Sequence, residues 1–170
     1  MIHTLTGSKF VCEEMNHMEA GEFLLGYEES HGYIGGMHIR DKDGVLAAML
    51  LCETAAWHKT QGRTLLDALE DLYQKYGYYI DEQDSFVFEG AKGAKEMQKI
   101  MVRLRSRRGS VFAPLGKPDK MLDYEKGVDE LPRSNVLKFF FPNGSWVAVR
   151  PSGTEPKIKF YYCIRGKDQR

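Results

Sequence analysis

One segment near the C-terminus concentrates groups that bind phosphate. Residues 150–157 read Arg-Pro-Ser-Gly-Thr-Glu-Pro-Lys and lie between two strand-like runs. Arg150 offers a planar fork of donors, Ser152 and Thr154 offer hydroxyls, and a phosphate needs many donors together with positive charge. Gly153 is expected to let the backbone turn sharply between the two stiffening prolines. The segment predicts a phosphate-binding loop, with a plain proline-rich turn as the alternative.

A second segment carries groups suited to sugar hydroxyls. Residues 26–32 read Gly-Tyr-Glu-Glu-Ser-His-Gly. Glu28 and Glu29 beside Ser30 can accept hydrogen bonds from vicinal hydroxyls, although a solvated acidic turn is the alternative. A charged loop at 40–45 follows and opens a helix. Hydroxyl recognition by one segment and phosphate recognition by the other together suggest a sugar phosphate as the ligand.

These segments resemble, in order and at similar spacing, motifs of the α-D-phosphohexomutases, the family of phosphoglucomutases and phosphomannomutases. Residues 28–30 resemble the sugar-binding loop of the family's third domain, and residues 150–156 resemble the phosphate-binding loop of its fourth. Residues 5–10 and 41–44 also have family counterparts. The resemblance covers nearly the whole chain and implies the C-terminal part of such an enzyme.

The resemblance also implies which residues bind substrate. They are Glu28, Ser30, Arg150, Ser152, Gly153, Thr154 and, just after the loop, Lys157, which is alternatively an outward strand residue. Glu29, His31 and His38 are further candidates. His31 is one position earlier than the histidine of some members, so a surface histidine is its alternative. Lys42 is the one candidate for a catalytic role, because it could assist proton transfer or simply be a solvated lysine.

Two elements of the family's chemistry are absent from the sequence. No Ser-His-Asn occurs, and of the Asp-Gly-Asp-Gly-Asp-Arg magnesium loop the chain has only Asp43-Gly44. By resemblance, the full-length enzyme uses Mg²⁺ and glucose 1,6-bisphosphate to move a phosphoryl group between the 1- and 6-positions of a hexose phosphate. This fragment is expected to hold no metal, to be inactive alone and to depend on missing N-terminal domains. A phosphopentomutase parent or a non-catalytic phosphosugar-binding module are the alternatives.

Composition narrows the remaining function classes. The 24 basic residues balance the 24 acidic ones, so no global charge favours nucleic acid or membrane. The run 103–108 is the one basic cluster; it could indicate nucleic-acid binding, but a basic helix C-terminus explains it more simply. Cys12, Cys52 and Cys163 form no CxxC or zinc pattern and indicate packed, reduced thiols of a cytoplasmic protein. No signal peptide is evident, and the apolar helix near 45–57 is too short to span a bilayer.

The first half, residues 1–77, is predicted to be a partial α/β domain. Helices are expected at 8–19, at 43–59 and from Thr64, with one strand at 22–25. Apolar residues cover most of the circumference of the helix at 43–59, which predicts burial on several sides. By resemblance the domain's opening strands precede Met1. Part of the sheet that this helix should cover would then be missing. Each aliphatic side chain that stays exposed to water loses roughly 1.5–3 kcal/mol of the free energy that its burial would contribute.

The second half, residues 78–170, is predicted to be an α+β domain with an antiparallel sheet packed by helices. By resemblance this is the TBP-like C-terminal domain of the phosphohexomutases. The expected elements are a strand at 85–89, a helix at 92–107, a loop-rich stretch at 109–133, a hairpin formed by 136–141 and 146–149, and a last strand at 158–164. The Asn-Gly pair between the hairpin strands is the strongest of these signals.

Overall fold

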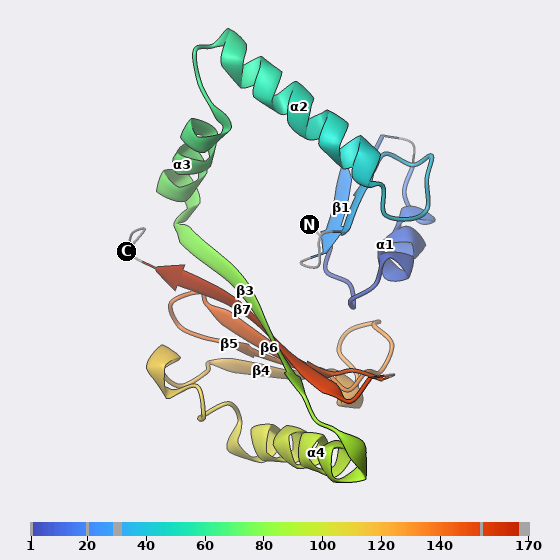
Figure 1. Ribbon diagram of the computed structural model, residues 1–170, viewed down its shortest axis with the longest axis vertical. Coiled ribbons are helices and arrows are strands. Elements are labelled where there is room, and N and C mark those ends of the chain that lie inside the picture. Colours follow the sequence, from blue (N-terminus) through green and yellow to red (C-terminus); the bar gives the residue numbers. More distant parts are fainter. Residues whose placement is uncertain (1, 20, 29–31, 154, 167–170) are drawn as a thin grey trace. The chain divides into compact units, whose positions relative to one another are not determined.

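The computed structural model in Figure 1 describes residues 2–19, 21–28, 32–153 and 155–166. The chain forms two units, Met1–Lys75 and Tyr76–Arg170, hereafter unit 1 and unit 2. Each unit has its own sheet. The predicted order, a partial α/β domain followed by an antiparallel α+β domain, is confirmed.

Unit 1 contains a two-stranded antiparallel hairpin and flanking helices. Its elements are α1 (Ser8–Met15), β1 (Leu25–Glu28), β2 (Gly32–Gly35), α2 (Gly44–Thr60) and α3 (Leu65–Tyr76), the last of which ends at the boundary with unit 2. The helix predicted at 8–19 ends at Met15. The strand predicted at 22–25 begins only at Leu25, and β2 was not predicted at all. Glycine is depleted in strands, so a hairpin with this much glycine has a weak strand signal.

Helix packing explains the glycines of this hairpin. A Cβ on Gly26 would lie 2.5 Å from Val11 Cγ1 of α1, and a Cβ on Gly35 would lie 2.7 Å from Leu46 Cδ2 of α2. The helices therefore contact the strand backbone directly, and a larger residue would push them away. Met15 and Ile34 are the buried hydrophobic residues that the structure describes in this unit.

Helix α2 begins as predicted but is not buried as predicted. Asp43 Oδ1 accepts hydrogen bonds from the backbone amides of Val45 and Leu46, both at 3.0 Å, which caps the helix. No residue of α2 is buried, and Trp57 is 59% exposed. The expectation of burial on several sides is wrong for this structure, because the two-stranded hairpin covers only one side of the helix.

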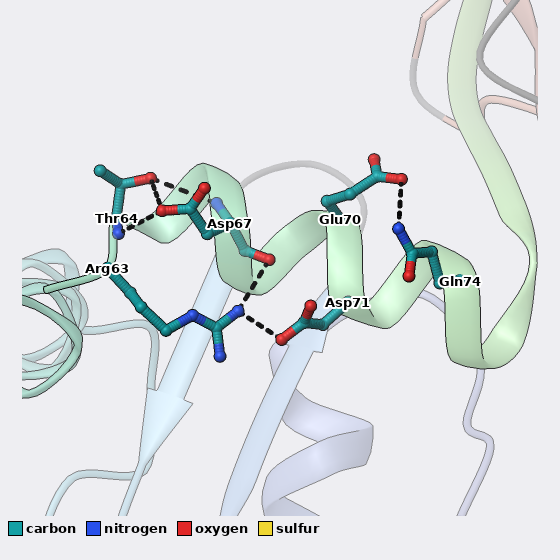
Figure 2. A network of polar contacts seen from close by, with 6 residues as sticks. All are labelled: Arg63, Thr64, Asp67, Glu70, Asp71 and Gln74. Atoms are coloured by element: carbon teal, nitrogen blue, oxygen red, sulfur yellow. Dashed lines mark hydrogen bonds and ion pairs between the residues drawn. The ribbon is translucent and has the colours of Figure 1, made fainter. Parts of the chain in front are cut away.

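A network of polar contacts fixes the start of α3 (Figure 2). Thr64 Oγ1 accepts from the Asp67 amide at 3.2 Å, and Asp67 Oδ2 accepts from the Thr64 amide at 2.7 Å. This reciprocal pair is a capping box. Arg63 also reaches over the first turn, donating to the Asp67 carbonyl at 3.1 Å and pairing with the Asp71 carboxylate. Gly77, which follows the last residue of the helix, has a φ of 104°.

Unit 2 is a five-stranded antiparallel sheet in the order β3-β7-β6-β5-β4, with α4 lying against one face (Figure 1). The elements are β3 (Tyr78–Val87), α4 (Gly90–Arg107), β4 (Lys120–Asp123), β5 (Leu137–Phe140), β6 (Trp146–Pro151) and β7 (Lys157–Gly166), with 3₁₀ turns at Ala113–Leu115 and Tyr124–Lys126. Helix α4 and the hairpin β5–β6 are confirmed close to their predicted bounds.

The core of unit 2 forms between α4 and the sheet. The buried residues from the helix are Met97, Met101 and Leu104, and those from the sheet side are Leu137, Phe139, Phe141, Val147, Val149 and Ile158. Buried and half-buried residues alternate along β5 and β6, so one sheet face packs on α4 and the other does not. The position that points away from α4 at the end of β6 is Arg150.

Two strands of unit 2 differ from the prediction, and both are at the sheet edges. Edge strand β3 begins at Tyr78 rather than at Ser85, and its early part carries Asp81 and Glu82 in place of an apolar pattern. Edge strand β4 lies inside the stretch that was predicted to be loop. Each has a sheet neighbour on one side only. Edge strands tolerate charged residues, so their sequences give a weak strand signal.

Candidate functional site

The predicted phosphate loop connects β6 to β7, two adjacent strands in the interior of the sheet of unit 2. Three backbone hydrogen bonds hold it: the Ser152 amide donates to the Lys157 carbonyl at 2.8 Å, the Lys157 amide to the Glu155 carbonyl at 2.7 Å, and the Phe88 amide to the Pro156 carbonyl at 2.7 Å. Ser152 Oγ accepts from the Glu155 amide at 3.2 Å. Thr154 lies outside the described residues.

Three cationic side chains belong to the sheet face that bears Arg150. Arg150 is paired directly with Lys159 across β6 and β7, and Lys157 is two residues before Lys159 on the same strand. Arg150 is half-buried, and its guanidinium has no hydrogen-bond or ion-pair partner among the described residues. Lys157 Nζ is 2.5 Å from Glu155 Oε2, and this contact lowers the pKa of Glu155. A guanidinium beside a second cation is suited to binding an anion.

Gly153 does not turn the backbone through a positive φ. Its φ is not in the positive range, so the expectation that a sharp turn requires glycine here is wrong. A Cβ at this position would meet no atom within 4 Å. The space next to the loop backbone is therefore open at this position.

In unit 1 the structure brings Glu28 and Lys42 together. Glu28 is the last residue of β1, its side chain is 11% exposed, and its Oε1 lies 2.9 Å from Lys42 Nζ. The contact is an ion pair rather than a well-directed hydrogen bond, since the enclosed Oε1 has no hydrogen-bond partner of regular geometry. Glu29, Ser30 and His31 lie outside the described residues. His38 is exposed in the segment between β2 and α2.

Gly32, the partner of Glu28 in the hairpin, makes room for this ion pair. A Cβ on Gly32 would lie 2.6 Å from Lys42 Cδ and 2.7 Å from Glu28 Oε1. Sequence reasoning treated Gly32 only as the place where some relatives carry histidine. Its function in packing could not be read from the sequence, because the lysine that crosses it comes from a different segment.

The environment of Lys42 keeps its ammonium charged. The short polar contact with Glu28, then Coulombic attraction to the same carboxylate, raises the pKa of Lys42. The neighbouring Asp41 accepts from the Lys42 amide at 2.7 Å and from Ser8 Oγ at 3.1 Å, and these bonds lower the pKa of Asp41. A lysine with a raised pKa is a poor proton acceptor at neutral pH. This geometry favours a role for Lys42 in holding Glu28.

The basic run at 103–108 ends α4, and its central cation is engaged within the unit. Arg105 Nε lies 3.1 Å from Asp123 Oδ2, while its Nη2 lies 3.0 Å from Glu125 Oε2 and donates to Asn135 Oδ1 at 2.7 Å. Arg108 caps the helix with a left-handed backbone, φ 47°. These contacts support the helix-terminus interpretation over a nucleic-acid surface.

The remaining predicted features have a mixed outcome. The three cysteines are free, but Cys52 is exposed rather than packed. Among the described residues no group of three or more His, Cys, Asp and Glu side chains could hold a metal ion. Within the same residues, no helix has both the length and the apolar character needed to cross a membrane. A shallow depression of about 410 Å³ on α1 contains none of the predicted site residues.

Comparison with known proteins covers both units. Two family models match in succession: "Phosphoglucomutase/phosphomannomutase, alpha/beta/alpha domain III" over residues 1–76 and "Phosphoglucomutase/phosphomannomutase, C-terminal domain" over residues 64–168. The chain is 37% identical over 171 residues to a phosphoglucomutase of Staphylococcus epidermidis and 36% identical over 172 residues to one of Staphylococcus haemolyticus. Each alignment covers 94% of this chain and 31% of the relative, so the chain spans less than a third of these relatives.

A solved structure has a similar fold. It is the exocytosis-sensitive phosphoprotein pp63/parafusin, a phosphoglucomutase from Paramecium, crystallised in an open form. The similarity has a TM-score of 0.69 at 26% sequence identity and covers 96% of this chain and 29% of that chain.

Proposed function

Because the chain belongs to the phosphoglucomutase/phosphomannomutase family, we propose that it is the substrate-binding C-terminal part of a phosphoglucomutase. The whole enzyme would move a phosphoryl group between the 1- and 6-positions of a hexose. A phosphoserine would donate the group, and glucose 1,6-bisphosphate would be the intermediate that reorients. Relatives named phosphoglucomutase support glucose over mannose or a pentose as the sugar. The division into domains at 77/78 and a cytoplasmic location belong to the same proposal.

The observation that carries this proposal is the state of Arg150. Its half-buried guanidinium has no partner among the described residues, and it lies beside Lys159 at the start of the loop that joins β6 to β7. Arg150, Ser152, Gly153 and Thr154 would grip the phosphate that is not being transferred, with Lys157 adding charge. Gripping a remote phosphate positions the reacting end of the sugar, which is where binding energy accelerates a reaction.

The hairpin of unit 1 would bind the sugar. Lys42 Nζ is paired with Oε1 of Glu28. The second oxygen of Glu28 would then accept hydrogen bonds from sugar hydroxyls, together with Ser30. Glu29, His31 and His38 are further contacts under this proposal. Lys42 would orient the carboxylate and touch a sugar oxygen rather than remove a proton, because its pKa is raised.

Two parts of the chemistry would come from outside this chain. Magnesium, when bound, would polarise the transferring phosphoryl group. The residues present do not fit such an ion, because no cluster of ligands occurs among the described residues. The phosphoserine and the metal would belong to the preceding polypeptide. The residues of this chain would bind the substrate.

A solution NMR titration of the 170-residue chain tests the proposal. Inorganic phosphate should move the amide signals of Ser152 and Gly153, whereas sodium chloride at equal ionic strength should not. Glucose 1,6-bisphosphate should move the same signals and, in addition, that of Glu28. If phosphate moves the amides of 103–108 and leaves the loop unchanged, the basic end of α4 is the anion site and the proposal fails.

A further inference from the structure

The outer side of helix α4, opposite the side that packs on the sheet, carries a row of cations. Met97, Met101 and Leu104 form the inner, buried side of the helix. With about 3.6 residues per turn, residues three or four apart in the sequence share one side of a helix. The exposed cations that share the outer side, hereafter the basic stripe, are Lys92, Lys95, Lys99, Arg103 and Arg107.

The basic stripe has little compensating negative charge around it. Lys99 Nζ lies 2.6 Å from Glu96 Oε1. The other cations of the stripe form no ion pair with any residue that the structure describes. Glu96 is the one acidic residue of α4, although the whole chain carries 24 basic and 24 acidic residues. Positive charge is therefore concentrated on this side of unit 2.

The helix dipole explains only the C-terminal end of the basic stripe. Cations stabilise the last turn of a helix and destabilise the first turn. Arg107 lies in the last turn of α4, but Lys92 lies in the first turn, which has no acidic residue. Like charges four residues apart, such as those of Arg103 and Arg107, also destabilise a helix. The stripe costs the helix stability, which favours a role in binding.

We propose that the basic stripe is a docking surface for an acidic segment of another protein. Residues four apart on a helix are about 6 Å apart along its axis. A segment with carboxylates at that spacing pairs with successive cations of the stripe, and the pairing fixes its register on α4.

Two residues beside the stripe favour a protein partner over other polyanions. Val102 lies three residues after Lys99, so the two side chains are neighbours on the helix surface, and Val102 is 64% exposed. An apolar side chain of a protein complements it, whereas a phosphate backbone does not. Glu96 lies on the same side of α4 and would repel the continuous phosphates of a nucleic acid or a lipid surface.

Titration of the 170-residue chain with designed peptides tests this docking surface. The probe is a helical peptide with glutamate at every fourth position and one leucine three residues after a glutamate. It should move the NMR amide signals of residues 95–103, and added salt should weaken binding because it screens exposed charges. Glutamine in place of the glutamates should abolish binding. Serine in place of the leucine should weaken binding about fivefold, because the contact with Val102 is lost.

Two variants of the chain separate the basic stripe from net charge. Arg103→Glu should weaken binding of the probe by more than about tenfold, because it places like charges opposite each other. The amide signals of β5 and β6 should stay in place, which shows that the unit is folded. Lys120→Glu is the matched control, since Lys120 is exposed on β4 and pairs with Phe140, on the sheet face away from α4. It should change binding by less than about twofold.

Four results would overturn the inference. Tighter binding of a DNA duplex, or of vesicles that contain phosphatidylserine, would make the stripe a general surface for polyanions. Equal losses in Arg103→Glu and Lys120→Glu would mean that only net charge matters. Equal binding of the leucine and serine peptides would remove the reason for a protein partner. Sedimentation that shows association of the chain with itself, abolished by Arg103→Glu, would identify the partner as a second copy.

Discussion

Arg150 is the residue on which phosphate recognition should depend most. Arg150→Ala should abolish most of the response of the Ser152 and Gly153 amides to phosphate, because the guanidinium, which has no partner among the described residues, supplies a charge-assisted bond worth about 1.5–3 kcal/mol. Lys157→Ala should cost less, since Lys157 is already paired with Glu155 at 2.5 Å. The measurement is the dissociation constant for phosphate by NMR titration.

Arg107→Ala is the control for loss of a positive charge elsewhere in unit 2. Arg107 is exposed in the last turn of α4 and should leave the titration unchanged. Equal losses in Arg150→Ala and Arg107→Ala would mean that phosphate responds to net charge alone, and the loop would not be a site.

Gly32 should control the ion pair between Glu28 and Lys42. In Gly32→Ala the added Cβ would lie 2.6 Å from Lys42 Cδ and 2.7 Å from Glu28 Oε1, so these flexible side chains must move apart. The pKa of Lys42, raised by Glu28 in the native chain, should fall back towards its ordinary value. NMR titration of the lysine Cε signals measures this shift.

The sign of the accompanying stability effect follows from the raised pKa. A raised pKa in the folded chain means that the pair stabilises unit 1 below the unfolded pKa of Lys42, and that this contribution is lost as the pH rises through the folded value. Gly32→Ala should remove that alkaline dependence. Glu28→Gln, which keeps the side-chain shape, should remove it too. If either variant keeps the alkaline pH dependence of stability seen in the native chain, another group is responsible for it.

At the scale of elements, Arg105 joins the end of α4 to the edge of the sheet and the turn that follows it. The side chain of Asp123 is 5% exposed, and its carboxylate forms an ion pair with Arg105, whose side chain is 20% exposed. Arg105→Met should therefore lower the free energy of unfolding by roughly 3 kcal/mol, because the buried carboxylate loses its closest cation and keeps only Lys126 Nζ at 4.0 Å. Urea unfolding measures the change. Arg103→Met, at an exposed position of the same helix, should change stability by less than about 0.5 kcal/mol.

The start of α3 should be sensitive to acid (Figure 2). The hydrogen bond from the Thr64 amide, then that from the Thr64 hydroxyl, lowers the pKa of Asp67 below 3.8. The capping box therefore stabilises α3 above that pH and is lost as the pH falls through the lowered pKa. The amide signal of Thr64 should titrate with a midpoint below 3.8. In Asp67→Asn this titration should be absent, and a midpoint at the ordinary value would mean that the bonds do not form in solution.

Elements stabilised by residues close together in the sequence could be predicted, and elements stabilised by distant segments could not. Caps, the Asn-Gly hairpin and helix α4 rest on neighbouring residues, so their positions were predictable. Strands β2 and β4 were missed, because a glycine-rich hairpin and a short charged edge strand are stabilised by segments distant in sequence. For the same reason the motifs indicated Glu28 and Arg150, but not the contribution of Gly32 or Lys159, which depends on pairing across strands.

At the scale of the whole molecule, the two units differ in how much core they have. Unit 2 buries a continuous cluster between α4 and its sheet, whereas Met15 and Ile34 are the buried hydrophobic residues described in unit 1. Apolar residues on α2 and α3 instead remain exposed, for example Leu51 at 59% and Leu72 at 52%. Burial of apolar side chains is the main favourable term in folding. Unit 2 therefore has the means to fold without unit 1.

This difference predicts the behaviour of the separated units. A polypeptide of residues 76–170 should give a dispersed NMR spectrum and a cooperative urea transition, and it should keep the phosphate response of Ser152 and Gly153. A polypeptide of residues 1–75 should unfold without cooperativity, since its hairpin leaves α2 and α3 largely exposed to water. Phe139→Ala, which opens a cavity in the core of unit 2, should cost about 3–5 kcal/mol in both 76–170 and the whole chain. A much larger loss in the isolated unit would show that unit 1 supports this core, and that phosphate binding depends on both units.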